Sequence, residues 1–275
     1  MSTSSVTVPP RRGERRGLQT AVAHSCFFAQ RELRNLARQP WWIAVSLAQP
    51  IIYLLLFAAL FRKIVEIPGF GARSYVNFFT PGVVVMTALF SGGWGGMGII
   101  NDLDRGVMDR FLVSPAYRGA LIAGRLAQQT IVSIIQSLII VGLALAIGAS
   151  FPGGVLGVLV LLCVAILLGM GFGALSISLG LLLRREESVI AAVQFVLLPL
   201  TFLSSVFMAQ NLAPAWIQDV GRFNPVNWAA QAGRAVLGAN VDWGLVGSRA
   251  GYLVAFTLVC AFLATRAFRA YQRSV

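Results

Sequence analysis

Six stretches of about twenty or more residues in this chain contain no aspartate, glutamate, histidine or lysine. An α-helix of about 20 apolar residues crosses the hydrocarbon core of a bilayer. Only 12% of the 275 residues are charged, about half the share of about 25% that is usual in soluble domains. The sequence therefore predicts an all-α integral membrane protein. Its six transmembrane helices are expected near residues 42–61, 78–100, 126–148, 155–183, 189–207 and 245–264.

The basic residues indicate how such a protein is oriented. An even number of spans places both termini on the same side of the membrane. Sixteen of the 22 lysine and arginine residues lie in the segments expected on that side, and six lie in those on the other side. Basic residues collect in cytoplasmic loops, so both termini are predicted to be cytoplasmic. The same rule explains the net charge of +12 in a chain this apolar, and we expect no nucleic-acid partner.

The segment before the first span divides into two parts. Residues 1–17 are rich in serine, proline and arginine and are predicted to form a disordered cytoplasmic tail. In residues 18–40, apolar residues recur every three or four positions on one helical face, and Arg31, Arg34 and Arg38 fall on the opposite face. This pattern predicts an amphipathic helix at the membrane interface. A second cytoplasmic tail is expected at residues 266–275, after the six-helix domain of residues 41–265.

The cytoplasmic connection between the second and third spans carries an unusual density of charge. Asp102 and Asp104 suit the start of a helix, and Ser114 followed by Pro115 suits its end. We therefore expect a short charged helix at about residues 102–115, outside the membrane. The alternative is a solvated loop with no function of its own.

Residues 208–238, after the fifth span, are too apolar for a free aqueous loop and too interrupted to cross a bilayer. The stretches Pro214–Gly221 and Pro225–Gly238 each begin with proline and end with glycine, as helices often do. Asn224 is well placed as the N-cap of the second stretch. The sequence thus predicts an external re-entrant or interfacial hairpin of two short helices, which must pack against protein if it enters the membrane.

Several chemistries are disfavoured by what the chain lacks. Lys63 is the only lysine and is not part of a phosphate-binding loop, and His24 is the only histidine. The spans hold no acidic residue to relay protons. Gly93–Gly98 matches G-x-G-x-x-G but lies inside a span, so it is not read as a dinucleotide site. Glycines four residues apart instead predict close helix packing, at Gly92 and Gly96, Gly153 and Gly157, and Gly169 and Gly173.

Three groups of residues resemble the ABC-2 permeases, the six-helix membrane subunits of ABC exporters, notably the daunorubicin-resistance type. The first group is Asp104-Arg-Gly106, Phe111-Leu-Val-Ser-Pro115 and Gly124-Arg125, which is similar to the family's cytoplasmic pattern. The second is residues 199–205, 212–216 and 224–230 together with Arg234, which is similar to the external region after span five. The third is the amphipathic helix, which resembles the family's connecting helix. Together they cover almost the whole chain in the family's order.

The resemblance implies a function that the residues alone do not give. It implies a permease subunit of an ABC exporter in a bacterial plasma membrane, which moves a drug, an antibiotic or a lipid-like compound outward. In such a complex, ATP and magnesium bind to two copies of a separate ATPase subunit. The permease itself is no enzyme, binds no cofactor or metal, and pairs with a second copy or a related permease. An ion-coupled secondary carrier and a non-transporting scaffold or immunity protein are the alternative classes.

The resemblance and the residue pattern together select candidate functional residues. The resemblance implies that the coupling helix docks on the ATPase, and aromatic residues of spans one, two and five are expected to line a substrate pathway. The coupling-loop candidates are Asp102, Asp104, Arg105, Gly106, Asp109, Arg110, Phe111, Ser114 and Pro115. The pathway candidates are Tyr53, Phe57, Phe90, Trp94, Gln194, Phe195 and Phe202. The hairpin candidates are Pro214, Trp216, Asn224, Pro225 and Arg234.

Overall fold

The computed structural model describes residues 40–68, 70, 72, 74–104 and 120–273, and the structural statements below concern these residues. The predicted amphipathic helix and residues 105–119 of the predicted coupling segment lie outside them. Helices make up the described chain apart from its turns and short connections. They are α2 (Pro40–Leu60), η1 (Ile64–Glu66), α3 (Tyr75–Gly93), α4 (Gly95–Asp104), α6 (Ala120–Ala146), α7 (Gly154–Leu183), α8 (Glu186–Phe202), η2 (Gln210–Leu212), α9 (Ala215–Arg222), α10 (Pro225–Leu237) and α11 (Trp243–Arg273).

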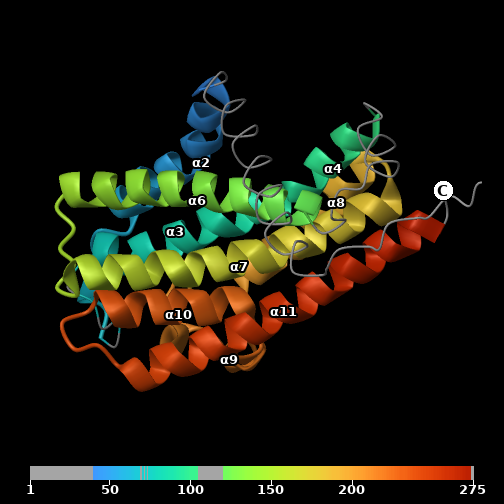
Figure 1. The fold of residues 1–275 in the computed structure, drawn as a ribbon. Helices are drawn as coiled ribbons and strands as arrows, with labels where there is room; N and C mark the ends of the chain where they lie inside the picture. Colours follow the sequence, from blue (N-terminus) through green and yellow to red (C-terminus); the bar gives the residue numbers. More distant parts are fainter. Residues whose placement is uncertain (1–39, 69, 71, 73, 105–119, 274–275) are drawn as a thin grey trace, which may run out of the picture.

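Helix α7 is the centre of the bundle. It contains no charged residue in 30 positions, and a helix that is apolar on every side is stable only when apolar surroundings cover all of it. It packs against α3, α4, α6, α8, α10 and α11. Figure 1 shows α7 in the middle, with α3 and α6 on one side and α10 and α11 on the other.

Four described helical segments are long and apolar enough to cross a membrane, judged by length and composition. They are Tyr75–Asp102, Gly124–Ala146, Gly154–Leu183 and Trp243–Arg269, and they correspond to the second, third, fourth and sixth predicted spans. The apolar part of α2, Ala44–Leu60, is shorter. Helix α8 has 17 residues. The count of six spans therefore stays a prediction.

The second span is interrupted at Trp94, where the sequence predicts one continuous helix. Helix α3 ends at Gly93 and α4 begins at Gly95. The hydroxyl of Ser176 on α7 lies at the break, where it donates to the carbonyl oxygen of Gly93 and accepts from the amide of Gly96 at 2.9 Å. One neighbouring side chain thus binds a polar backbone group on each side of the interruption.

The fifth span ends earlier than predicted. Helix α8 stops at Phe202, and residues 203–208 form turns instead of continuing to Phe207. The Asn224 side chain donates to the carbonyl oxygens of Leu200 and Leu203, at 2.6 and 3.2 Å, and so binds backbone groups at the end of α8. Asn227 then accepts from the amide of Ser205 at 3.1 Å. The helix ends here because polar side chains of a later helix hold the backbone in another path.

The three predicted glycine pairs lie at close helix crossings. A Cβ atom at Gly92 would overlap the carbonyl oxygen of Gly169 on α7. One at Gly153 or Gly157 would overlap the carbonyl oxygen of Val236 on α10. Backbones can approach this closely only where no side chain intervenes, so the packing role predicted for these glycines is confirmed.

Candidate functional site

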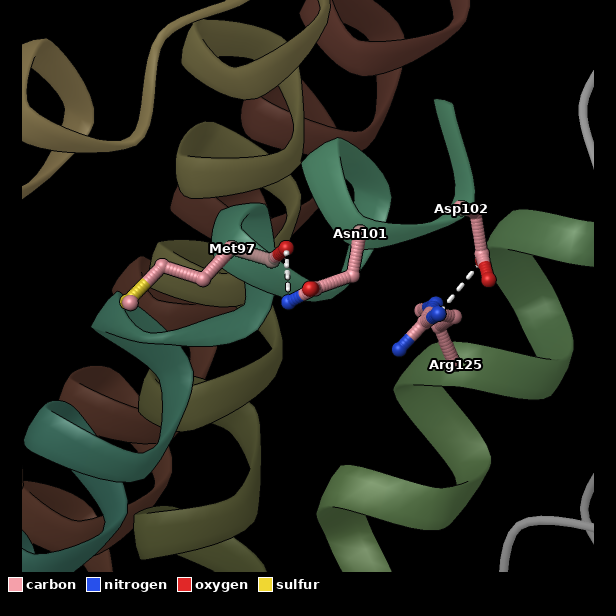
Figure 2. Close-up of polar contacts among 4 residues, drawn as sticks. All are labelled: Met97, Asn101, Asp102 and Arg125. Carbon is pink, nitrogen blue, oxygen red and sulfur yellow. Dashed lines mark hydrogen bonds and ion pairs between the residues drawn. The ribbon is translucent and has the colours of Figure 1, made fainter. Parts of the chain in front are cut away.

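A buried ion pair joins the ends of α4 and α6. Arg125 of α6 donates from its guanidinium to the carboxylate of Asp102, and the two side chains are only 17% and 9% exposed. Figure 2 shows them pointing toward each other across the two helices, while Asn101 turns back to the carbonyl oxygen of Met97 on its own helix. The guanidinium lies against Gly98, where any side chain would collide with it. The pair fixes the relative position of the two helices on either side of residues 105–119.

The predicted coupling helix does not start at Asp102. Asp102 and Asp104 form the last turn of α4 and do not begin a new helix. The physical reason is that α4 continues the second span, and Asp102 is held there by Arg125. Of the other predicted coupling-loop residues, Arg105, Gly106, Asp109, Arg110, Phe111, Ser114 and Pro115 lie outside the described residues, as do Arg31, Arg34 and Arg38 of the predicted connecting helix.

A cavity of about 720 Å³ lies beside this ion pair. Residues of α2, α3, α4, α6, α7 and α8 line it, and Arg125 is one of them. Small-molecule sites in proteins usually measure about 300–1,000 Å³, so the cavity has the size of a drug-sized ligand. It is formed within a single chain.

The cavity brings together three of the seven predicted pathway residues. Tyr53 lines it from α2, Phe90 from α3, and Trp94 from the interruption between α3 and α4. Tyr53 also accepts a hydrogen bond from Gln49 at 3.1 Å, another cavity residue. The structure therefore brings Tyr53 to the same wall as Phe90 and Trp94, which lie 37 and 41 residues further along the chain.

The other four predicted pathway residues do not line this cavity. Phe57 and Phe202 line a smaller one of about 370 Å³, near α9. Phe195 points outward from α8 and is 82% exposed, so it faces the surroundings of the bundle. Gln194 lines neither of these two cavities.

The main residues that sequence reasoning missed are glutamines. Gln128, Gln129 and Gln136 line the large cavity from α6, and Gln49 lines it from α2. Gln129 donates to the carbonyl oxygen of Gly169 at 2.9 Å, and Gln136 donates to the Ser46 hydroxyl at 2.7 Å. The sequence did contain a signal for these glutamines, because a side-chain amide at membrane depth is costly unless it finds a hydrogen-bond partner. Three of them on one apolar helix indicate a face turned toward protein.

The predicted pair of short helices after α8 is confirmed. Helices α9 and α10 begin directly after Pro214 and Asn224. The Asn224 side chain accepts from the amide of Val226 at 2.9 Å, as expected of an N-cap, and Pro225 occupies the first turn of α10. Trp216 on α9 is 61% exposed. Insertion of this pair into a membrane stays a prediction.

Arg234 ties the α9–α10 region to the bundle. Its guanidinium donates to the carbonyl oxygens of Phe78, at 3.1 Å, of Ser205, and of Val206, at 3.2 Å, and to the Ser205 hydroxyl at 2.9 Å. It also lies 3.8 Å from the centre of the Phe78 ring, a favourable cation–π geometry. One side chain therefore links α10, α3 and the turn after α8. This region lies next to the first half of α7, away from the Arg125 ion pair.

We expect the substitution Arg234→Met to lower the free energy of unfolding by about 2 kcal/mol, because it leaves carbonyl oxygens of the 203–208 turn without their donor. Thermal unfolding of the purified protein in detergent measures the change. Arg222→Met is the control, since Arg222 is largely exposed and its ion pair with Asp219, at 3.6 Å, is a surface contact. Equal melting temperatures for the two variants would contradict the anchoring role of Arg234.

The chain is similar to known proteins over most of its length. Residues 25–238 match the family described as ABC-2 type transporter. The chain is 30% identical over 225 residues to the daunorubicin resistance ABC transporter permease protein DrrB1 of Streptomyces coeruleorubidus, covering 82% of this chain and 78% of that protein.

Two further relatives share less identity. The putative transport permease ycf38 of Cyanophora paradoxa is 28% identical over 198 residues, 72% of this chain and 68% of that protein. The probable doxorubicin resistance ABC transporter permease protein DrrC of Mycobacterium tuberculosis is 20% identical over 262 residues, 95% of this chain and 93% of that protein. The family match covers most of the chain, including the ion pair, the cavity helices and the α9–α10 region. The chain therefore belongs to the ABC-2 type transporter family, as the membrane permease component of an ABC transporter.

Proposed function

We propose that this permease exports a hydrophobic or amphipathic compound across the plasma membrane, with ATP hydrolysed by a separate nucleotide-binding subunit. The observation that carries the proposal is that Arg125 takes part in two contacts. It lines the large cavity and also holds Asp102, two residues before the end of α4. A force on the segment that follows α4 would thus act on a wall of the cavity. The drug-resistance names of two relatives favour a drug or antibiotic as the transported compound.

We also propose that the working unit contains two permease chains and two ATPase subunits, with both termini of each permease in the cytoplasm. Large apolar side chains on α2 and α8 support a second chain on that side of the bundle. Ile52, Leu56, Phe195 and Phe202 are all at least half exposed, and exposed apolar side chains of this size are typical of a surface that contacts lipid or another protein. The arginine distribution supports the orientation.

Affinity purification of the full chain from its native membrane in mild detergent tests the proposed function. Mass spectrometry should find a stoichiometric soluble subunit with the nucleotide-binding motifs of an ABC ATPase. Recovery of the chain alone, under conditions that preserve a known ABC complex, would contradict the proposal. In that case export that stops with an uncoupler at constant ATP would indicate a secondary carrier, and no export at all would indicate a scaffold.

The segment of residues 105–119 yields a separate prediction about coupling. Replacing Arg105, Asp109 and Arg110 together with alanine should lower transport-linked ATP turnover at least about tenfold, because charged contacts to the ATPase are removed. The assembled complex in vesicles is assayed for ATP hydrolysis with and without substrate. As a control, alanine at Arg184 and Arg185, which follow α7, should leave turnover within about twofold. Unchanged turnover in the triple variant would show that the segment is only a connection.

A further inference from the structure

Helix α11 lies at the edge of the bundle and leaves one long face uncovered. Its other face packs on α7 and α10, where Thr257 donates to the carbonyl oxygen of Leu167 at 2.8 Å (Figure 1). The uncovered face is apolar along the middle of the helix. Its large exposed side chains are Tyr252, Val254, Leu258, Val259, Phe262 and Leu263. An exposed apolar face of this kind, on a helix long enough to cross a bilayer, is typical of a surface that contacts lipid.

An arginine stands at each end of this face. Arg249 and Arg266 are 17 positions apart, and no charged residue lies between them. Seventeen residues of α-helix are about 26 Å long. The hydrocarbon core of a bilayer is about 30 Å thick, and the long side chain of arginine carries its charge outward from the helix toward the headgroups. The spacing of the two guanidinium groups therefore matches the two phosphate layers of a bilayer.

Each of these arginines lies over an aromatic ring. The guanidinium carbon of Arg249 is 5.8 Å from the centre of the Tyr252 ring, and that of Arg266 is 5.6 Å from the centre of the Phe262 ring. Both rings lie between the two arginines along α11. The Tyr252 ring also contacts Trp228 on α10, with 5.3 Å between the ring centres. Rings on the inner side of a polar group are typical of the boundary between hydrocarbon and headgroups.

The described chain leaves the charge of both arginines without a carboxylate partner. The ion pairs among the described residues involve neither Arg249 nor Arg266. Asp242 is the acidic residue nearest to Arg249 along the chain, and its carboxylate accepts from the amide of Leu245 at 3.0 Å. The Nε atom of Arg249 is buried and has no acceptor among the described residues. Arg269, one turn after Arg266, is exposed and adds a further positive charge. An anion is therefore favoured at both ends of the face.

A phospholipid matches both parts of this surface. Its phosphate is an anion that lies at the membrane interface, and a guanidinium group can bind a phosphate through two parallel hydrogen bonds. Its acyl chains match the apolar side chains between the arginines. A soluble anion would match the arginines alone, and an uncharged apolar molecule would match the face alone.

We propose that the uncovered face of α11 binds phospholipids of both leaflets, with one lipid phosphate on Arg249 and another on Arg266 and Arg269. The acyl chains lie along the apolar side chains between these arginines. The bound lipids hold the two ends of α11 at a fixed depth in the membrane. This surface is separate from the large cavity, and the proposal does not depend on the exported compound or on the ATPase.

Native mass spectrometry of the full chain in mild detergent tests the proposal. The probes are dioleoyl phosphatidylglycerol and dioleoylglycerol, which have the same acyl chains, whereas only the first has a phosphate. Titration with each lipid gives the Kd values of the successive molecules that bind. We expect the phosphatidylglycerol to bind about tenfold more tightly, because each phosphate gains charge-assisted hydrogen bonds.

Substitution of the arginines should remove the bound lipids one at a time. Arg249→Gln should lower the number of phosphatidylglycerol molecules retained per chain by one, and adding Arg266→Gln and Arg269→Gln should lower it by one more. Arg249→Lys keeps the charge and should keep the lipid, which guards against a variant that fails to fold. Arg222→Gln is the matched control, since Arg222 is an exposed arginine of α9 that pairs with Asp219. Lipid retention should be unchanged in this control.

Several results would overturn the proposal. They are equal retention of the two lipids by the original chain, an unchanged number of phosphatidylglycerol molecules in Arg249→Gln, and an equal loss in Arg222→Gln. Displacement of the lipid by an excess of glycerol 3-phosphate would show a site for a soluble anion instead. A dimer that Arg249→Gln dissociates would show that a second copy of the chain covers this face.

Discussion

Replacing Arg125 with leucine is expected to lower the free energy of unfolding by about 3–5 kcal/mol. The substitution removes the guanidinium from the Asp102 carboxylate, which is nearly buried at the end of α4. A buried carboxylate that loses its partner keeps the full cost of its desolvation. Asp102→Leu should have a similar effect for the reciprocal reason. Thermal and denaturant unfolding in detergent, followed by far-UV circular dichroism, measure both single variants.

The double variant Asp102→Leu with Arg125→Leu separates the effect of an unpaired buried charge on stability from the effect of losing the contact between α4 and α6. Because both charges are removed together, no buried charge is left, and most of the lost stability should return. Transport-linked ATP turnover should not return, since under the proposed function the pair also joins the cavity wall to the segment after α4. A double variant whose loss of stability equals the sum of the two single losses would show that the two residues act independently of each other.

The substitution Gly92→Ala is expected to cost several kcal/mol of stability, although alanine is the better helix former by about 1 kcal/mol. A methyl group at Gly92 would overlap the carbonyl oxygen of Gly169, and backbone atoms cannot move aside as a flexible side chain does. Helices α3 and α7 would have to separate, and their contact is one of the main contacts of the bundle.

Gly142→Ala is the matched control for this substitution. Gly142 lies inside α6, and a Cβ atom there meets nothing within 4 Å. The helix propensity should then dominate, so this variant should be as stable as the original chain or slightly more stable. Melting temperatures of the two purified variants decide the matter. The expectation fails if both alanines change stability in the same direction.

Periodicity and composition predicted much of the fold. Four of the expected spans appear as long apolar helices, because length and apolarity are properties of the local sequence. The same holds for α9 and α10, whose start at Asn224 follows from local capping chemistry. The interruption at Trp94 and the early end of α8 were missed. Both depend on hydroxyl and amide groups that arrive from distant parts of the chain, from Ser176 and Asn224.

The candidate site was predictable only in part, for a related reason. Tyr53, Phe90 and Trp94 stand out as aromatic residues in spans, and the structure brings them together. The ion pair between Asp102 and Arg125 joins side chains that are 23 positions apart on two different helices, and no local pattern encodes such a contact. The glutamines of α6 are visible in the sequence, but only packing shows that Gln136 reaches the cavity.

The interruption at Trp94 divides the second span into two segments, and α7 holds both of them. Helix α4 has 10 residues and is therefore about 15 Å long. Gly92 on α3 and Gly96 on α4 both lie against the backbone of α7, and the Ser176 hydroxyl binds backbone groups on either side of the interruption. Trp94, which lines the large cavity, therefore stands between two anchored segments. The position of its ring at the cavity wall is set by α7, because the helices before and after Trp94 along the chain both pack on α7.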